Sequence, residues 1–265
     1  MIIFHTGGVE VLKKRNPKQL YVFFSLESPI HANIDGYEER YKSFFNLTMT
    51  YKRDSDIFFP YGEMKSGGKI SDKKATSSRS KDDRKLAAWV VSHCETQSQR
   101  EKYVEEMKKW IPIDQYGKCS AWGFWGNCDE DCFNNLGTNY KFYLSFENSL
   151  CKEYVTEKFW RILAQNLVPV VLGSANYTDL APPHSFINVQ DFESPEHLSK
   201  YLLKLHKNQT EYNKYLEWKT TYTIVSSVSQ RMCDLCERVH NSEKKVYSHF
   251  GDWWHKDACT GPAWG

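Results

Sequence analysis

The alternation of buried strands and helices after residue 85 restricts the fold of this chain more than any other feature. Apolar, β-rich runs at residues 86–91, 141–146 and 168–172 predict strands, and helical spacing of apolar residues at 97–110 and 156–166 predicts helices between them. Strands separated by helices of this length form a parallel, Rossmann-like sheet. Ligands of such sheets bind beyond the carboxyl ends of the strands, so the segments after residues 91 and 146 are candidate binding loops.

A second, smaller unit precedes this sheet. Residues 20–26, LYVFFSL, predict a buried strand that ends at a Glu-Ser-Pro turn. We divide the chain into a partial first domain at 1–64, a Lys/Ser/Gly-rich flexible linker at 65–85, a Rossmann-like domain at 86–219, and an irregular Cys-rich tail at 220–265. About 64 residues are few for an independent core.

Composition and charge exclude some classes of function. The chain has 35 Lys+Arg against 33 Asp+Glu, a formal charge of +2, which argues against a nucleic-acid partner and favours small or neutral ligands. Its N-terminus, MIIFHTGGVEVLKKRNPK, lacks the long apolar core of a signal peptide, and no run approaches the roughly 18 apolar residues of a membrane span.

Cysteines and glycosylation sequons together favour an oxidising, lumenal environment. The pair Cys233 and Cys236 has zinc-site spacing, but no second pair stands at the distance of a zinc ribbon. We therefore expect disulfides, although their pairing stays open. The disulfide candidates form two sets, a bridged tail cluster of Cys233, Cys236 and Cys259, and a set with at least one bridge among Cys119, Cys128, Cys132 and Cys151. The glycosylation sequons begin at Asn46, Asn176 and Asn208.

The segment after residue 146 carries the most chemistry. Glu147-Asn148-Ser149 follows the strand, and a helix with Lys158 in its first turn begins ten residues later. Free backbone amides and the helix dipole favour an anion at such a position, which predicts an anion site. The alternative is a solvated lysine, and it is less favoured because Glu147 and Glu157 crowd the same junction.

The histidines give a weaker signal. His5, His31, His93 and His184 stand apart in the sequence, and a surface or packed histidine is the default interpretation of each. His93 follows the strand that ends at Val91, so a contact with a bound ligand is one further interpretation.

Several strings of residues, in order, resemble one known family. The most specific strings are FYLSFENS, YVTEK and VPVVLG, and the others are FFSLESPIH, FNLTMTYKRDSDIFFPYG, AAWVVSHC and HSFINVQDFESPEHLSKYL. Together they resemble the α1,3/4-fucosyltransferases, glycosyltransferase family 10. The resemblance covers nearly all of residues 20–219. It implies a GT-B fold, in which two Rossmann-like domains face a cleft, the first of them incomplete in this chain. It also implies transfer of L-fucose from GDP-fucose, with inversion, to a GlcNAc hydroxyl of a glycoprotein or glycolipid glycan in α1,3 linkage.

The resemblance assigns roles to individual residues of the donor site. Lys158 and Arg100 match the cations that neutralise the diphosphate, and the developing charge of a GDP leaving group suits a guanidinium fork and an ammonium. Glu157 matches the carboxylate that holds the fucose ring, and Asn148 and Tyr154 match positions of the donor pocket.

The catalytic base comes from the first domain. Glu27, in the LESP string, matches the general base that accepts the proton of the acceptor hydroxyl, and one carboxylate suffices for a single inverting displacement. Without the resemblance, Glu27 is a turn glutamate.

Metal is not expected to take part. Asp54-Ser55-Asp56 resembles the DxD metal motif of other glycosyltransferases, but in GT-B enzymes Lys and Arg replace the metal. We expect no metal site and no required cofactor, with a divalent cation at most a stimulant, and a structural ion pair between Arg53 and Asp54.

The chain also departs from the family pattern. Family members carry a type II membrane anchor and further strands before the point where this sequence starts, so we expect a Golgi enzyme with a lumenal catalytic domain whose anchor is missing here. CSAWGFWGNCDEDC and GSANYTDLAPPHSF are similar to invertebrate or core-type members. The choice of acceptor glycan stays open. The alternatives are a GDP-sugar-binding remnant without activity and a GT-B glycosyltransferase that uses another donor.

Overall fold

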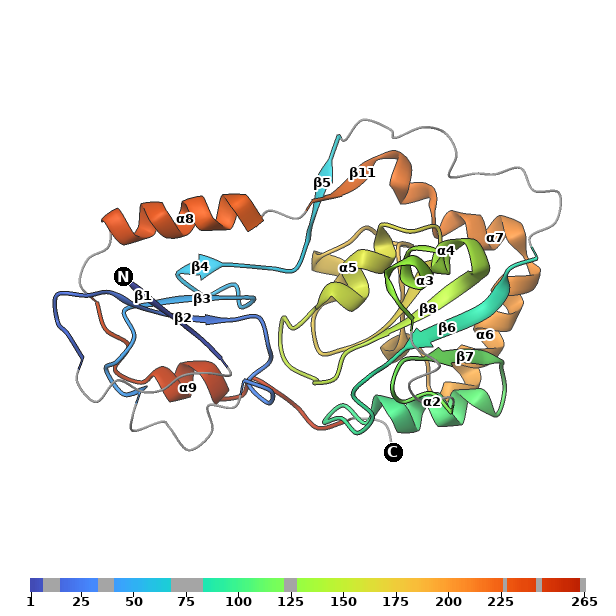
Figure 1. The fold of residues 1–265 in the computed structure, drawn as a ribbon. Helices are drawn as coiled ribbons and strands as arrows, with labels where there is room; N and C mark the ends of the chain where they lie inside the picture. The colour runs from blue at the N-terminus through green and yellow to red at the C-terminus, as the bar shows by residue number, and fades with distance from the viewer. Residues whose placement is uncertain are drawn as a thin grey trace.

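The protein consists of two parallel α/β domains that lie side by side (Figure 1). The computed structural model of the chain describes residues 1–6, 15–32, 41–67, 83–121, 128–225, 228–241 and 245–262. The segment between strands β4 (Ile57–Phe58) and β5 (Glu63–Ser66) connects the domains. The prediction of an α/β fold with parallel sheets is confirmed.

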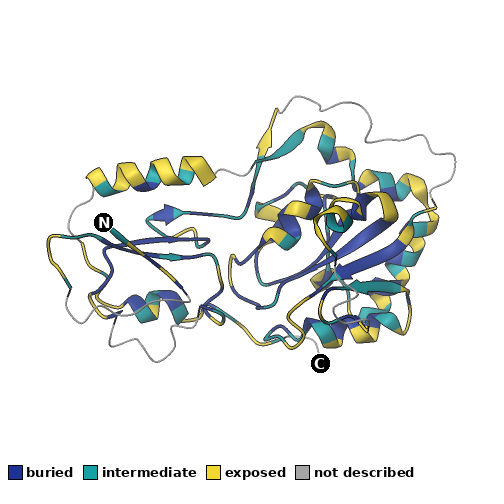
Figure 2. Cartoon of the chain, in the orientation of Figure 1, coloured by how far each residue is buried: buried dark blue, intermediate teal, exposed yellow. Residues whose placement is uncertain are grey.

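The larger domain is a three-layer structure around a five-stranded parallel sheet in the order β10-β9-β8-β6-β7. Its strands are β6 (Lys85–Val90), β7 (Ile113–Tyr116), β8 (Tyr140–Phe146), β9 (Val168–Leu172) and β10 (Ile187–Asn188). Helices α2 (Arg100–Lys108), α6 (Pro195–Lys207) and α7 (Gln209–Lys214) pack on one face, and α3 (Glu130–Asn134), α4 (Leu136–Asn139) and α5 (Glu157–Leu163) on the other. Both faces of β8 and β9 are buried (Figure 2), which explains why β9 is apolar throughout and β8 is apolar except for the buried Lys141 and Ser145.

The smaller domain has a four-stranded parallel sheet in the order β1-β2-β3-β4. Strand β1 is Ile2–His5, β2 is Tyr21–Ser25 and β3 is Leu47–Thr50. Side chains alternate between the two faces of β2, with Tyr21 and Phe23 in one apolar cluster and Val22 in another.

The C-terminal segment completes this smaller domain, so the prediction of an irregular tail after residue 219 is wrong. Helix α8 (Val228–Asn241) buries Leu235 against β3 and β4, and α9 (Phe250–His255) buries Phe250 and Trp254 in the aromatic cluster on the other face. A small sheet cannot bury both faces with its own residues, and these two helices supply the missing apolar surface.

The predicted linker 65–85 falls mostly outside the described residues. Its first residues belong to β5, which pairs antiparallel with β11 (Tyr222–Val225) in the register Ser66 to Tyr222. In the part of the chain that the structure describes, no helix combines the length and the apolarity needed to cross a bilayer.

The described residues contain three disulfides, Cys94–Cys119, Cys128–Cys132 and Cys151–Cys259. The bridge between Cys128 and Cys132 confirms the second predicted set. The predicted tail cluster is wrong, because Cys233 and Cys236 are free thiols exposed on α8. Helix α8 covers one face of the smaller sheet, whereas Cys259 follows α9 on the other face and bonds to Cys151 after β8.

Candidate active site

The two domains meet at the carboxyl ends of their central strands. Ser28 follows β2 and Ser149 follows β8, and their buried hydroxyl oxygens lie 2.8 Å apart in a hydrogen bond across the junction. The loop that carries Glu27 and the predicted binding loop after residue 146 are therefore brought face to face, as expected for parallel sheets whose ligands bind at this edge.

Glu27 presents an exposed carboxylate at this junction. The turn after β2 is fixed by the Ser25 hydroxyl, which accepts from the Glu27 amide at 3.2 Å, and by Tyr61, whose hydroxyl donates to the Leu26 carbonyl at 2.7 Å. The Tyr154 hydroxyl from the other domain donates to Glu27 Oε2 at 3.1 Å. Burial raises the pKa of Tyr154, so this phenol remains a donor at neutral pH.

Glu147 and Lys158 form a buried ion pair beside this contact. Glu147 follows β8 and is fully buried, and its Oε2 lies 3.4 Å from Lys158 Nζ. The backbone amide and the hydroxyl of Thr156, the N-cap of α5, also donate to the Glu147 carboxylate. Burial raises the pKa of Glu147 against the opposing effect of Lys158. The pKa of Lys158 is raised, because Glu147 and then Glu157 outweigh the cost of burial.

Glu157 and Asn148 flank this pair. Glu157, the first residue of α5, is exposed, and its Oε1 lies 3.3 Å from Lys158 Nζ. Asn148 is half-buried, and its carbonyl accepts from the Ser98 amide at 3.2 Å. The structure therefore brings the predicted donor residues of the β8 to α5 segment to one edge of the larger sheet.

Arg100 is buried at the start of α2, where it holds the backbone of the same edge. Its Nη1 donates to the Phe146 carbonyl at 2.6 Å and its Nη2 to the His93 carbonyl at 3.3 Å, while Nε has no partner among the described residues. Burial lowers the pKa of Arg100, and Glu147 opposes this shift. Arg100 therefore acts on the site through its charge and by positioning the ends of β6 and β8.

The structure brings together two histidines that the sequence analysis treats as isolated. The rings of His31 and His93, one from each domain, lie 5.1 Å apart between centroids. Burial and then His93 lower the pKa of His31, with smaller contributions from Arg100 and Lys158, while Glu27 raises it. Separation in the sequence hid this contact, although both histidines follow strands at the predicted binding edge.

The DxD-like segment is used for structure. The Asp56 side chain is only 3% exposed, and its Oδ1 lies 2.5 Å from Lys245 Nζ. Asp54 accepts from the Trp253 indole at 2.9 Å. The expected Arg53–Asp54 ion pair is wrong, because Arg53 reaches across the junction to Glu153, with its amide 3.0 Å from Glu153 Oε2.

The three sequons differ in accessibility. Asn176 and Asn208 are exposed at the starts of short helices. Asn46 is only 3% exposed, its Oδ1 accepts from the Tyr21 amide and its Nδ2 donates to the Lys245 carbonyl. The folded protein has no room for a glycan there, so the structure contradicts the prediction for Asn46.

The arrangement combines an exposed carboxylate on one Rossmann-like domain with a lysine and a glutamate on the other. A base and a leaving-group site on opposite sides of a junction suit a displacement between two bound substrates. Two parallel α/β domains whose sheet edges meet at the candidate site form the arrangement known as the GT-B fold.

Comparison with known sequences identifies the family. The family description "Glycosyltransferase family 10 (fucosyltransferase) C-term" matches residues 80–253, and "Fucosyltransferase, N-terminal" matches residues 1–62. The chain therefore belongs to glycosyltransferase family 10, the family that the sequence strings resemble.

Curated relatives and solved structures agree with this assignment. α-(1,3)-Fucosyltransferase C of Drosophila melanogaster is 34% identical over 96% of this chain and 64% of its own length. A Bos taurus 3-galactosyl-N-acetylglucosaminide 4-α-L-fucosyltransferase is 41% identical over 87% of this chain and 61% of its own length. The chain thus spans less than two thirds of these relatives. A crystal structure of an α1,3-fucosyltransferase shares the fold, with a TM-score of 0.60 at 19% identity over 84% of this chain and 73% of that chain.

Proposed function

We propose that the protein transfers L-fucose from GDP-fucose to a GlcNAc hydroxyl of a glycoprotein or glycolipid glycan, in α1,3 linkage and with inversion at the fucose C1. The observation that carries this proposal is the contact between Glu27 and Tyr154, because it sets a carboxylate of the first domain beside the donor segment of the second. Relatives named as α1,3-fucosyltransferases, and a neighbouring structure titled as a complex with GDP-fucose, support the choice of donor.

The reaction is a single displacement. Glu27 accepts the proton of the acceptor hydroxyl while the hydroxyl oxygen forms a bond to the fucose C1. The bond from C1 to the β-phosphate oxygen breaks, and GDP leaves with the electron pair. Lys158 stabilises the charge that develops on the diphosphate, and Arg100 adds its positive field from the start of α2. Glu157, exposed beside Lys158, binds the fucose ring, and Asn148 lines the donor pocket.

The two cations allow this chemistry without a required cofactor, and a divalent ion would act at most as a stimulant. The disulfides support an oxidising compartment, so we propose a Golgi lumenal location for the catalytic domain, with a membrane anchor in the full-length protein.

The test compares Glu27→Gln with Glu193→Gln, a matched change at an exposed carboxylate of the larger domain. Glu27→Gln should lower kcat by roughly 100- to 10,000-fold and leave the Kd for GDP-fucose within about twofold, because only proton transfer is removed. The control should retain full activity. Near-normal turnover of Glu27→Gln would exclude Glu27 as the base.

Two further outcomes would favour the alternatives. GDP binding by the unaltered chain without any fucose transfer would favour a binding remnant. Thermal stabilisation by a UDP-sugar and not by GDP-fucose would exclude the proposed donor.

A further inference from the structure

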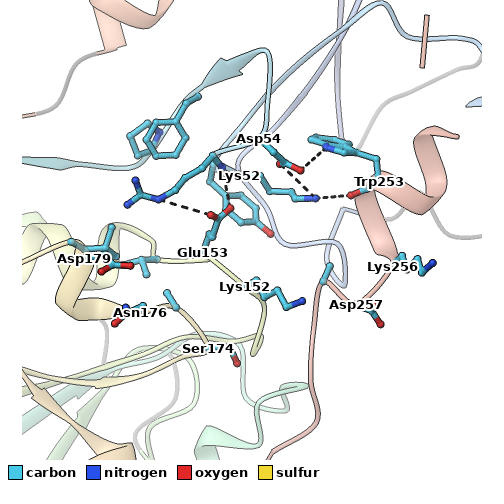
Figure 3. Close-up of a pocket in the computed structure, with 18 of the residues that line it drawn as sticks. Lys52, Asp54, Lys152, Glu153, Ser174, Asn176, Asp179, Trp253, Lys256 and Asp257 are labelled. Carbon is cyan, nitrogen blue, oxygen red and sulfur yellow. Dashed lines mark hydrogen bonds and ion pairs between the residues drawn. The ribbon is translucent and has the colours of Figure 1, made fainter. Parts of the chain in front are cut away.

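Two groups of polar side chains lie where the domains meet. A cavity of about 770 Å³ is lined by both cations and carboxylates, and in its wall Arg53 lies 3.9 Å from the carboxylate of Glu153 (Figure 3). The described lining of this cavity includes neither His31 nor His93. These two histidines form a separate cluster, in which positive groups are in excess.

His31 lies in the turn after β2, four residues beyond the proposed base Glu27. Its backbone amide donates to the Ser28 carbonyl at 3.0 Å, which fixes the turn that carries the ring. The ring is half-buried and lies 5.1 Å, between centroids, from His93 of the larger domain. Its Nε2 is buried and has no hydrogen-bond partner among the described residues. Buried nitrogens usually have a partner, so packing alone does not account for a histidine at this position.

The groups that act on the charge of His31 come from four elements. Burial is the largest cause and lowers the pKa of His31 from its ordinary value of 6.5. From the larger domain, His93 after β6, Arg100 on α2 and Lys158 on α5 lower this pKa further. Glu27, in the turn that carries His31, raises it. The imidazole is therefore neutral at neutral pH in the protein without a ligand.

A bound donor diphosphate would change this balance. The proposed function places the diphosphate beside Lys158 and Arg100, where its negative charges oppose the fields of both cations. Because His31 lies within the same fields, the bound diphosphate also favours a positive charge on its imidazole. Glu27 on the other domain acts in the same direction.

We propose that His31 takes up a proton from solvent when GDP-fucose binds, and that the resulting imidazolium joins Lys158 and Arg100 in stabilising the charge of the departing GDP. The inference rests on the proposed function and extends it, because it adds a group of the smaller domain to the donor site. The proton returns to solvent when GDP leaves, so the reaction cycle consumes none. A charge that appears only with the donor avoids a further cation beside Lys158 and Arg100 in the empty site.

Calorimetry measures the proton uptake directly. GDP-fucose is titrated without acceptor at pH 6.5 in two buffers of different ionisation enthalpy, since the difference in heat gives the number of protons bound. GDP-fucose is preferred to GDP because its diphosphate, esterified at both ends, does not titrate near neutral pH. We expect net uptake in the unaltered protein, and none in His31→Gln or in His31→Phe, which keeps a ring against His93. The control is His197→Gln, a change of an exposed histidine on α6, and it should retain the uptake.

The pH dependence of Kd gives a second measurement. The bound protein holds more protons than the free protein, so binding becomes tighter as the pH falls. Kd for GDP-fucose should fall about tenfold between pH 8 and pH 6 in the unaltered protein, since one unit of pKa shift corresponds to a factor of ten. In His31→Gln it should change by less than about twofold over the same range.

Proton uptake that persists in His31→Gln, or GDP-fucose binding without uptake in the unaltered protein, would overturn this inference and leave the proposed function intact. Loss of the uptake in His197→Gln would place the proton elsewhere and would also overturn it. Absence of any GDP-fucose binding would overturn the proposed function and this inference together.

Discussion

Replacement of Lys158 by Met tests the buried ion pair that links fold to chemistry. Glu147 is fully buried, and Lys158 Nζ lies 3.4 Å from its Oε2. Removal of one partner of a buried pair costs about 3 to 5 kcal/mol. Thr156 still donates two hydrogen bonds to Glu147 in the variant, so we expect the lower end, a loss of about 3 kcal/mol in the free energy of unfolding at pH 8.

This loss should depend on pH. Burial raises the folded-state pKa of Glu147 above its ordinary value of 4.5, and without Lys158 nothing as strong opposes the shift. A carboxyl with a raised pKa binds its proton more tightly in the folded state, so stability increases as the pH falls through the folded pKa. The deficit of Lys158→Met should therefore be largest at pH 8 and shrink toward pH 5. Urea unfolding followed by tryptophan fluorescence measures it.

The double variant Glu147→Gln/Lys158→Met separates stability from binding. A neutral amide beside Thr156 should restore the free energy of unfolding to within about 1 kcal/mol of the unaltered protein. If Lys158 binds the diphosphate, the GDP affinity of the double variant, measured by calorimetry, should stay about 10- to 100-fold weaker than that of the unaltered protein. This is the loss expected when one charged hydrogen bond is removed. Full recovery of GDP affinity would refute the donor role of Lys158, and a pH-independent deficit would refute the ion-pair argument.

Three further predictions concern the fold. Cys151→Ser opens a bridge between residues 108 apart in sequence and should lower the free energy of unfolding by about 4 to 5 kcal/mol. Cys132→Ser opens a bridge across a separation of 4 and should lower it far less. Denaturant unfolding with and without reductant measures both changes. Gly62→Ala sets a Cβ 2.6 Å from an indole carbon and should cost about 1 to 3 kcal/mol, whereas Gly261→Ala meets open space and should be neutral by thermal unfolding. After expression in a secretory host, glycopeptide mass spectrometry should find a glycan on the exposed Asn208, and its absence from that site would contradict the sequon prediction.

Much of the larger domain could be predicted because its signals are local. The predicted strand 168–172 has the same limits as β9, and the strand that ends at residue 146 places Glu147 and Asn148 at the binding edge. A strand that is buried on both faces is largely apolar, and the residues after it must lie at the sheet edge.

The ends of the chain could not be assigned in the same way. Helix α8 carries Val228, Met232, Leu235 and Val239 at helical spacing, but its packing partner becomes clear only when Leu235 meets β3 and β4. Disulfide pairing also escaped prediction, because residues 108 apart in sequence, Cys151 and Cys259, are brought together by the packing of α9.

The sequence by itself determined the family and the parallel α/β class, and it named candidate donor residues, since motifs and periodicity are local. The tertiary structure decided which of these residues meet. Tyr154 reaches Glu27 across 127 residues, and His31 reaches His93 across the domain junction. Such contacts depend on the docking of two domains through buried surfaces far apart in sequence, and no local pattern records that docking.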